Sequence, residues 1–272
     1  MTVKPMGSWP HSPLIMVLAQ VRFESFIGWE AMAKGFQALI QQDYPRFNEQ
    51  QILPFNVRPT DVGQLDVSPE VQAFKYFEFK NADETKCLRL DSGSLTYTVT
   101  EYEQYSDFFE ADWFRSLQAL TNQHPLYLKR LGLRYVDLFQ TENIEAISEY
   151  INPPLASGLG LDGWTSTNRF AVCDYTRDNQ KLRVQLFQQR GAPPLPPDIA
   201  SLQIKKSVLQ SINPEKTSVI LDMDRMEDVS GVLSAIDLRD RFISIHEDLS
   251  NAFRAIITDD ARQKWGDPKL EQ

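Results

Sequence analysis

The chain has 272 residues, of which 42% are hydrophobic and 24% are charged, as is usual for soluble folded proteins. Its 28 Lys and Arg against 37 Asp and Glu give a net charge of −9, which repels a phosphate backbone and argues against nucleic-acid binding. Two cysteines are too few for a disulfide framework, and neither they nor the three histidines form a pair at metal-ligand spacing. We therefore predict no structural metal and no cofactor.

The first apolar run, PLIMVLAQV at residues 13–21, is followed directly by Arg22. It is much shorter than the roughly 20 apolar residues of a membrane span, and no small-residue cleavage site follows it. We expect residues 13–24 to form a strand of a cytoplasmic protein without a membrane segment.

A second stretch repeats this pattern 112 residues later. Pro-Leu, six residues and an apolar-Arg-aromatic step occur at residues 13–23 and again at residues 125–135. In each case a helix is expected next, at residues 29–40 and 141–150, because apolar residues recur at helical spacing in the first and Thr141 can cap the second. Strand-like runs then follow in both halves, at residues 51–59, 74–81, 86–93 and 94–102, and at residues 166–176, 181–189 and 217–226.

Each half closes with a predicted helix, at residues 107–122 and 235–264. The sequence thus predicts an α+β fold of two tandem pseudo-repeats, residues 1–122 and 123–272, that form one compact unit. Each repeat runs strand, helix, antiparallel strands, helix, with the helices on one face of a curved antiparallel sheet.

A proline-rich segment, GAPPLPPDIA at residues 191–200, separates the last two strands of the second half. Proline fixes φ and removes a hydrogen-bond donor, so the segment is predicted to be a loop. It is interpreted as a stiff surface loop, and the alternative is a lid or a docking segment for a partner.

Three segments resemble members of a sporadically distributed bacterial protein family. They are the lead strand from Pro13 to Phe23, the central RLGLRY strand at residues 130–135, and a terminal helix with His246, Phe253, Ile257 and Thr258. The family usually has Asn at the position of Asp137. The resemblance spans most of the chain. It implies that the chain is related to this family, to which no activity is attached. The patchy occurrence of the family implies a defence-associated or regulatory role.

Two equivalent arginines are the main candidates for ligand binding. Strand alternation places Arg22 and Arg134 on the sheet face away from the helices, where two guanidinium groups can bind an anion. Tyr97 or Tyr135 would supply a stacking surface, and Gly132 would leave room beside Arg134. The alternative is that both arginines pair with acidic neighbours such as Glu24 across the sheet.

Two further motifs are interpreted as structural. Asp222 and Asp224 share one strand face, as two magnesium ligands would, but we expect them on the solvent side and predict no metal there. His246 lies at the edge of the apolar stripe of its helix, where a hydrogen bond to a backbone carbonyl is expected.

The absence of a catalytic motif favours a non-enzymatic protein-binding or regulatory module, antitoxin-like or immunity-like, with a protein partner. A homodimer is left open. The alternative is a binding protein or enzyme for an anionic small molecule or nucleotide, held by Arg22 and Arg134 in a cleft of the sheet face.

Overall fold

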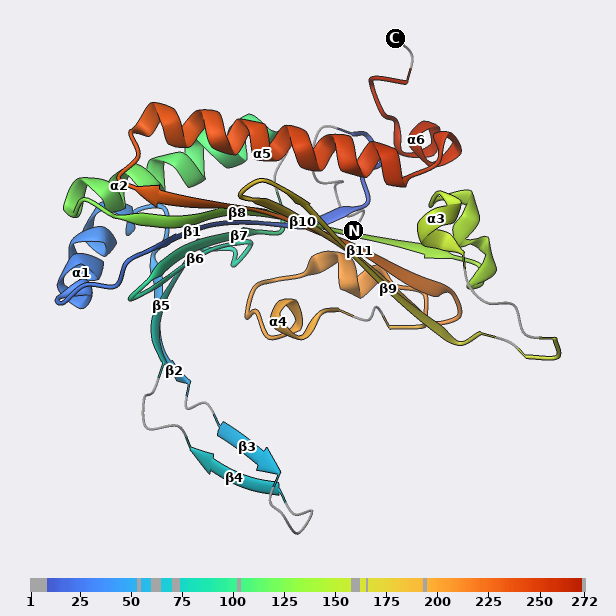
Figure 1. Ribbon diagram of the computed structural model, residues 1–272, viewed down its shortest axis with the longest axis horizontal. Coiled ribbons are helices and arrows are strands. Elements are labelled where there is room, and N and C mark those ends of the chain that lie inside the picture. Colours follow the sequence, from blue (N-terminus) through green and yellow to red (C-terminus); the bar gives the residue numbers. More distant parts are fainter. Residues whose placement is uncertain are drawn as a thin grey trace.

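The computed structural model describes residues 9–52, 55–59, 65–69, 74–101, 104–157, 162–164, 166–192 and 195–270. Within these ranges nine strands form one antiparallel sheet in the order β2-β5-β6-β7-β1-β8-β11-β10-β9 (Figure 1). The strands of this sheet are β1 (Leu14–Phe23), β2 (Arg46–Ile52), β5 (Phe74–Lys80), β6 (Lys86–Asp91), β7 (Ser94–Val99), β8 (Leu128–Thr141), β9 (Asn168–Arg177), β10 (Gln180–Arg190) and β11 (Thr217–Gly231). A separate two-stranded ladder pairs β3 (Phe55–Pro59) with β4 (Leu65–Pro69). The predicted α+β class with an antiparallel sheet is confirmed.

The two predicted lead strands lie side by side at the middle of the sheet. β1 pairs with β8, with Gln20 opposite Gly132. Outward from β1 come β7, β6, β5 and β2, and outward from β8 come β11, β10 and β9. Described strands from both predicted halves therefore build one continuous sheet, while the origin of the halves as repeats stays a prediction.

The helical elements differ from the sequence-based prediction at two places. They are α1 (Trp29–Ile40), the π-helical η1 (Asp107–Phe114), α2 (Arg115–Gln123), the 3-10 helices η2 (Glu145–Glu149) and η3 (Ser207–Ser211), and the α-helices α3 (Pro153–Ala156), α4 (Pro197–Ala200), α5 (Ala235–Ile256) and α6 (Asp259–Trp265).

The helix expected at residues 141–150 is only the short η2, because Thr141 is the last residue of β8 and its hydroxyl donates to the carbonyl of Asn143. The helix expected at residues 235–264 is divided in two at Ile257, because Thr258 caps a new helix by accepting from the Ala261 amide at 3.1 Å.

The main core lies between the sheet and the helices α1, α2 and α5, which cover one face in Figure 1. Alternate residues of the central strands point into it, as the period of two requires. Examples are Val21 of β1 and Leu133 of β8, which pack in the same cluster as Phe242 and Leu249 of α5. α5 begins at a capping box between Ser234 and Asp237, which satisfies two backbone donors.

The other face of the sheet is partly covered as well, which corrects the expectation of helices on one face only. The proline-rich segment at residues 191–200, predicted to be a loop, ends in the short helix α4, which lies on this side of the sheet in Figure 1. Ile199 and Ile204 pack there with Met16, Val136 and Ile220 in a second apolar cluster. The segment is therefore part of the folded core.

Among the described residues, no helix is both long enough and apolar enough to cross a membrane.

Candidate functional site

A cavity of about 460 Å³ lies where β8, α5 and the two ends of the described chain meet. We refer to it as the β8–α5 cavity. It is lined by Trp9, Ser12, Leu14, Tyr135, Asp137, His246, Glu247, Ser250, Asn251, Phe253, Arg254 and Lys269. Leu14 of β1, Tyr135 of β8, and His246 and Phe253 of α5 all contribute to this lining. Its volume is in the range of pockets that hold small molecules.

Tyr135 and Asp137 enter the cavity from β8, where residues two apart share a face. The Tyr135 hydroxyl lies 2.5 Å from Nδ1 of His246 on α5. The imidazole also stacks on the ring of Tyr105, with ring centroids 3.8 Å apart. Burial, followed by the charges of Arg254 and Lys269, lowers the pKa of His246 to about 4. The imidazole is therefore neutral near pH 7.

Asp137 is a buried carboxyl group in the lining of this cavity. Its side chain is 3% exposed, and Oδ2 has no hydrogen-bond partner in the described part of the chain. Burial, followed by the charge of Asp222, raises the pKa of Asp137 well above its ordinary range. A buried polar atom without a partner costs free energy, and a bound ligand that donates to it would remove this cost.

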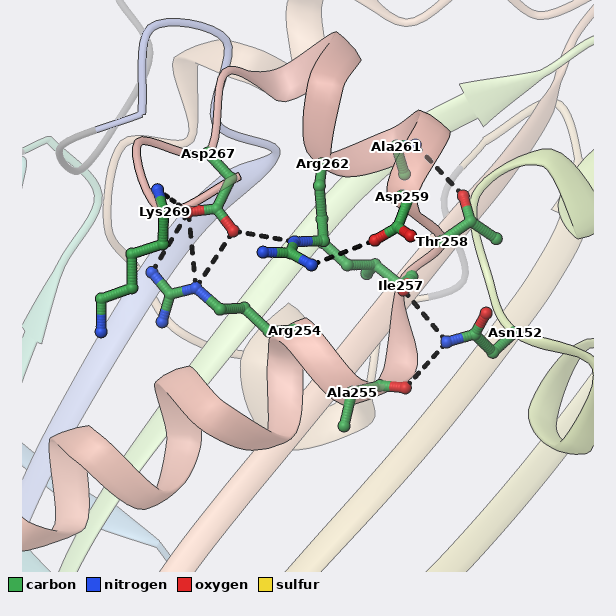
Figure 2. A network of polar contacts seen from close by, with 10 residues as sticks. All are labelled: Asn152, Arg254, Ala255, Ile257, Thr258, Asp259, Ala261, Arg262, Asp267 and Lys269. Carbon is green, nitrogen blue, oxygen red and sulfur yellow. Dashed lines mark hydrogen bonds and ion pairs between the residues drawn. The ribbon is translucent and has the colours of Figure 1, made fainter. Parts of the chain in front are cut away.

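Two basic residues, Arg254 and Lys269, also line the β8–α5 cavity. Figure 2 shows how Asp267 orders these two residues: it accepts from Arg254 Nε at 3.1 Å, from Arg262 Nε at 3.0 Å and from the Lys269 amide at 3.0 Å. Burial favours the neutral acid, but these hydrogen bonds outweigh it and lower the pKa of Asp267. Within the described ranges the Lys269 ammonium has no hydrogen-bond or ion-pair partner, so it is available to an anionic group.

A short turn after α5 returns the chain to the cavity. The Asn152 side chain donates to the carbonyls of Ala255 and Ile257, at 2.8 and 3.0 Å, and so closes the last turn of α5 (Figure 2). Thr258 also donates to the carbonyl of Glu149. These contacts give Ile257 and Thr258 a structural role. They set the direction in which α6 leads the chain to Asp267 and Lys269 at the cavity.

The four residues predicted to bind an anion are not brought together. Arg22 and Arg134 share the sheet face away from α5, as expected, but they line two different cavities, of about 400 and about 300 Å³. Arg22 is exposed and lies opposite Arg130. Arg134 is held in ion pairs with Asp222 and Asp198.

The two tyrosines lie on the other face of the sheet, which rules out stacking beside the two arginines. Tyr97 is fully buried, donates to Asp112 at 3.0 Å and stacks on Phe108. Tyr135 belongs to the β8–α5 cavity. The physical reason is the alternation of a strand, because Tyr135 and Arg134 are neighbours in sequence and therefore point to opposite faces.

Asp222 is fully buried, which corrects the expectation that it faces solvent. It accepts from Arg134 and from Gln185 at 3.1 Å, so it serves as an ion-pair partner. In the ranges that the structure describes, no group of three or more His, Cys, Asp or Glu side chains is placed to hold a metal ion.

His246 differs from its prediction in one respect. It lies at the core margin as expected, but its ring nitrogen Nδ1 contacts a side-chain hydroxyl, that of Tyr135, rather than a backbone carbonyl. Sequence reasoning also missed Trp9, Asp137 and Lys269 as members of a site. The signal for Asp137 was present, because a carboxyl group two residues after Tyr135 must share its buried face.

Together, fold and site define an antiparallel α+β protein with a ligand-sized cavity at the junction of its central strand and its longest helix. Comparison with protein-family models and with curated protein sequences gives no match to this chain.

Proposed function

We propose that the protein binds a small molecule in the β8–α5 cavity, one with hydrogen-bond donors on one side and an anionic group on the other. The observation that carries this proposal is the Asp137 carboxyl group, which is buried, borders the cavity and has an oxygen without a hydrogen-bond partner among the described residues. Buried polar groups in folded proteins are almost always paired, so the unpaired oxygen favours a ligand donor at this point.

The polarity of the cavity suggests how such a ligand is oriented. The positive charges of Arg254 and Lys269 help to lower the pKa of His246. The negative charge of Asp222 helps to raise the pKa of Asp137. A donor group would therefore face Asp137 and an anionic group would face Lys269. The rings of Trp9 and Phe253, with centroids 5.4 Å apart, supply apolar wall between them.

A guanine nucleotide has this arrangement, because its base carries two adjacent N–H donors and its phosphate is anionic. Guanosine monophosphate, adenosine monophosphate and guanosine are suitable probes, with binding measured by calorimetry. We expect guanosine monophosphate to bind at least about tenfold more tightly than the adenine nucleotide, since an unpaired charged partner typically costs that much or more. We expect guanosine without its phosphate to bind more weakly than the monophosphate.

Binding should also release a proton. A donor that meets Asp137 favours the ionised carboxylate, so the pKa of Asp137 falls from its raised value when the ligand binds. Calorimetry in two buffers of different ionisation enthalpy measures this release. Equal affinity for all three probes without proton release would contradict the proposal.

A second candidate function is protein binding through strand β9. In the described structure β9 pairs only with β10, so its other edge is open. Phe170, Val172 and Tyr175 are 59%, 44% and 56% exposed there. Open strand edges with apolar side chains can accept a strand of a partner. This observation supports a protein-binding role, and we propose a cytoplasmic regulatory module, antitoxin-like or immunity-like, as one form of it.

A comparison of two variants tests the second candidate. Val172→Lys places a charge on the β9 edge, and Lys181→Glu changes a charge in the neighbouring strand without touching that edge. The protein partner recovered with the native chain from its own host should be lost with the first variant and retained with the second. Equal recovery of the partner with both variants would contradict binding through the open edge of β9.

We further propose that residues 1–122 and 123–272 arose by duplication. The offset of 112 residues makes Gln20 and Gly132 equivalent, and these two residues lie opposite one another in the central β1–β8 pair. A duplicated lead strand would therefore pair symmetrically about this point. If so, the fragment 123–272 alone should dimerise through β8, and a fragment that stays monomeric and folded would contradict this proposal.

A further inference from the structure

A second cavity, of about 300 Å³, gathers three arginines on the sheet face away from α5. Arg89 of β6 and Arg130 and Arg134 of β8 line it together with Asp198 and Asp224. We refer to it as the arginine cavity. It shares no lining residue with the β8–α5 cavity.

Arg134 is held by Asp222 in an orientation that leaves its Nη1 directed away from Asp222. Its Nε and Nη2 donate to the two oxygens of Asp222, at 2.7 and 2.6 Å, and Asp222 is fully buried. This two-point contact holds the guanidinium plane, as is typical of arginine with a carboxylate. Nη1 is left to donate to Asp198.

Asp198 occupies this outer position without being fixed in the core. Its side chain is 63% exposed, and it belongs to the short helix α4. The next residue, Ile199, is fully buried in the apolar cluster beneath α4. The Asp198 carboxylate can therefore rotate into solvent while Ile199 keeps α4 in place.

The other two arginines keep donors for a ligand. Arg130 uses Nε for Asp228 at 3.0 Å, and Arg89 uses Nη2 for Glu78 at 2.8 Å. Within the described residues, Nη2 of Arg130 and both Nε and Nη1 of Arg89 make no hydrogen bond. The hydroxyl-bearing residues Thr96 and Thr98 line the same cavity.

We propose that the arginine cavity is an anion-binding site, in which a carboxylate or phosphate group of a small molecule replaces Asp198 on Arg134 and is also bound by Arg130 and Arg89. Asp198 is then a built-in competitor that occupies Nη1 in the free protein. The guanidinium group is planar, and its N–H groups match the spacing of two oxygens of a carboxylate or phosphate group.

The acidic group beside the site makes binding dependent on pH. Burial, followed by the opposing effect of Arg134 and the repulsion of Asp222 and Asp198, raises the pKa of Asp224 to about 6. Arg183 of β10 also acts on Asp224 and favours its charged form. A bound anion is repelled by ionised Asp224, so affinity should rise as the pH falls below about 6.

Calorimetry on the full chain with citrate and inorganic phosphate, at pH 5.5 and 7.5, tests this site. Asp198→Asn removes the competing charge and should tighten citrate binding about tenfold, which is the scale of one hydrogen bond between charged groups. Adding Arg130→Gln should reverse this gain. Glu215→Gln, an exposed glutamate paired with Arg190, is the matched control and should leave the affinity unchanged.

The assignment is overturned if Asp198→Asn binds both probes no more tightly than the native chain, or if Arg130→Gln has no effect on their binding. Lys269→Met distinguishes this site from the β8–α5 cavity, because it should leave citrate binding intact. Loss of binding in Lys269→Met would place the anion in the other cavity and also overturn the proposal.

Discussion

The hydroxyl of Tyr135 and Nδ1 of His246 lie 2.5 Å apart, although 111 residues separate them in the sequence. The contact joins the central strand β8 to the longest helix α5 at the edge of the β8–α5 cavity. Tyr105 completes the arrangement by stacking on the imidazole and donating to the carbonyl of Phe242 at 3.1 Å. The site is therefore held by side chains from three separate parts of the chain.

The first prediction concerns this contact. Tyr135→Phe should lower the free energy of unfolding by about 1–3 kcal/mol, because it leaves a partly buried nitrogen of His246 without this partner. Tyr127→Phe is the control, since Tyr127 is 49% exposed and its hydroxyl contacts Ser230 near the surface. The control should lose less than about 0.5 kcal/mol in the same urea titration. Equal losses in both variants would contradict the role given to the Tyr135–His246 contact.

The second prediction concerns the acid side of the stability profile. The folded-state pKa of His246 is lowered from 6.5 to about 4, so below about pH 6.5 the unfolded chain binds a proton that the folded chain does not. The stability that neutral His246 contributes is present above pH 6.5 and is lost as the pH falls toward 4. The loss is on the order of 3 kcal/mol at most.

His246→Gln should remove this part of the pH dependence, and the measurement is urea unfolding between pH 4 and pH 7. A nuclear magnetic resonance signal of His246 that titrates near pH 6.5 in both the folded and the unfolded protein would contradict the assignment.

The third prediction concerns Asp137, whose contribution to stability changes with pH in the opposite direction to that of His246. Because the folded-state pKa of Asp137 is raised, the unfolded carboxyl group releases its proton at lower pH than the folded one. The stability due to Asp137 is therefore present below its unfolded pKa of about 4 and is lost as the pH rises through the folded value. Asp137→Asn should raise the free energy of unfolding at pH 7 by at least about 1 kcal/mol. The gain should shrink as the pH is lowered toward 4, and a loss of stability at pH 7 would show that the carboxylate is already compensated.

The fourth prediction concerns the buried ion pair on the other face. Arg134→Met leaves fully buried Asp222 without its main partner and should cost about 3–5 kcal/mol. The double variant Arg134→Met/Asp222→Leu should recover most of this loss, because it removes both charges. Chemical denaturation of the two single variants and the double variant gives the coupling energy, and simple additivity would contradict the pairing.

Strand alternation and periodicity were enough to predict the sheet, its antiparallel class and the separation of Arg134 from the helix face. They were not enough to predict contacts between side chains that are far apart in the sequence. Nothing in the sequence pairs Tyr135 with His246 or Arg134 with Asp222, since such partners lie 88 to 111 residues apart.

The proline-rich stretch shows a second limit of the sequence. Its composition predicts a loop, but composition does not reveal that Ile199 and Ile204, just beyond the prolines, pack on the same sheet face on which Asp222 is fully buried. The solvent exposure of Asp222 was therefore predicted wrongly even though its strand and face were predicted correctly. Asp137 is the reverse case, in which the buried face was evident but the cavity beside it was not.

The affinity of guanosine monophosphate for the native chain, for Asp137→Ala and for Lys269→Met, measured by calorimetry, tests the central claim most directly. We expect each substitution to weaken binding at least about tenfold, because each removes one charged partner from the β8–α5 cavity. Asp174→Ala, in an exposed ion pair on β9, should bind as the native chain does. Unchanged affinity in Asp137→Ala, or no binding of the nucleotide to the native chain, would contradict a ligand site at this cavity.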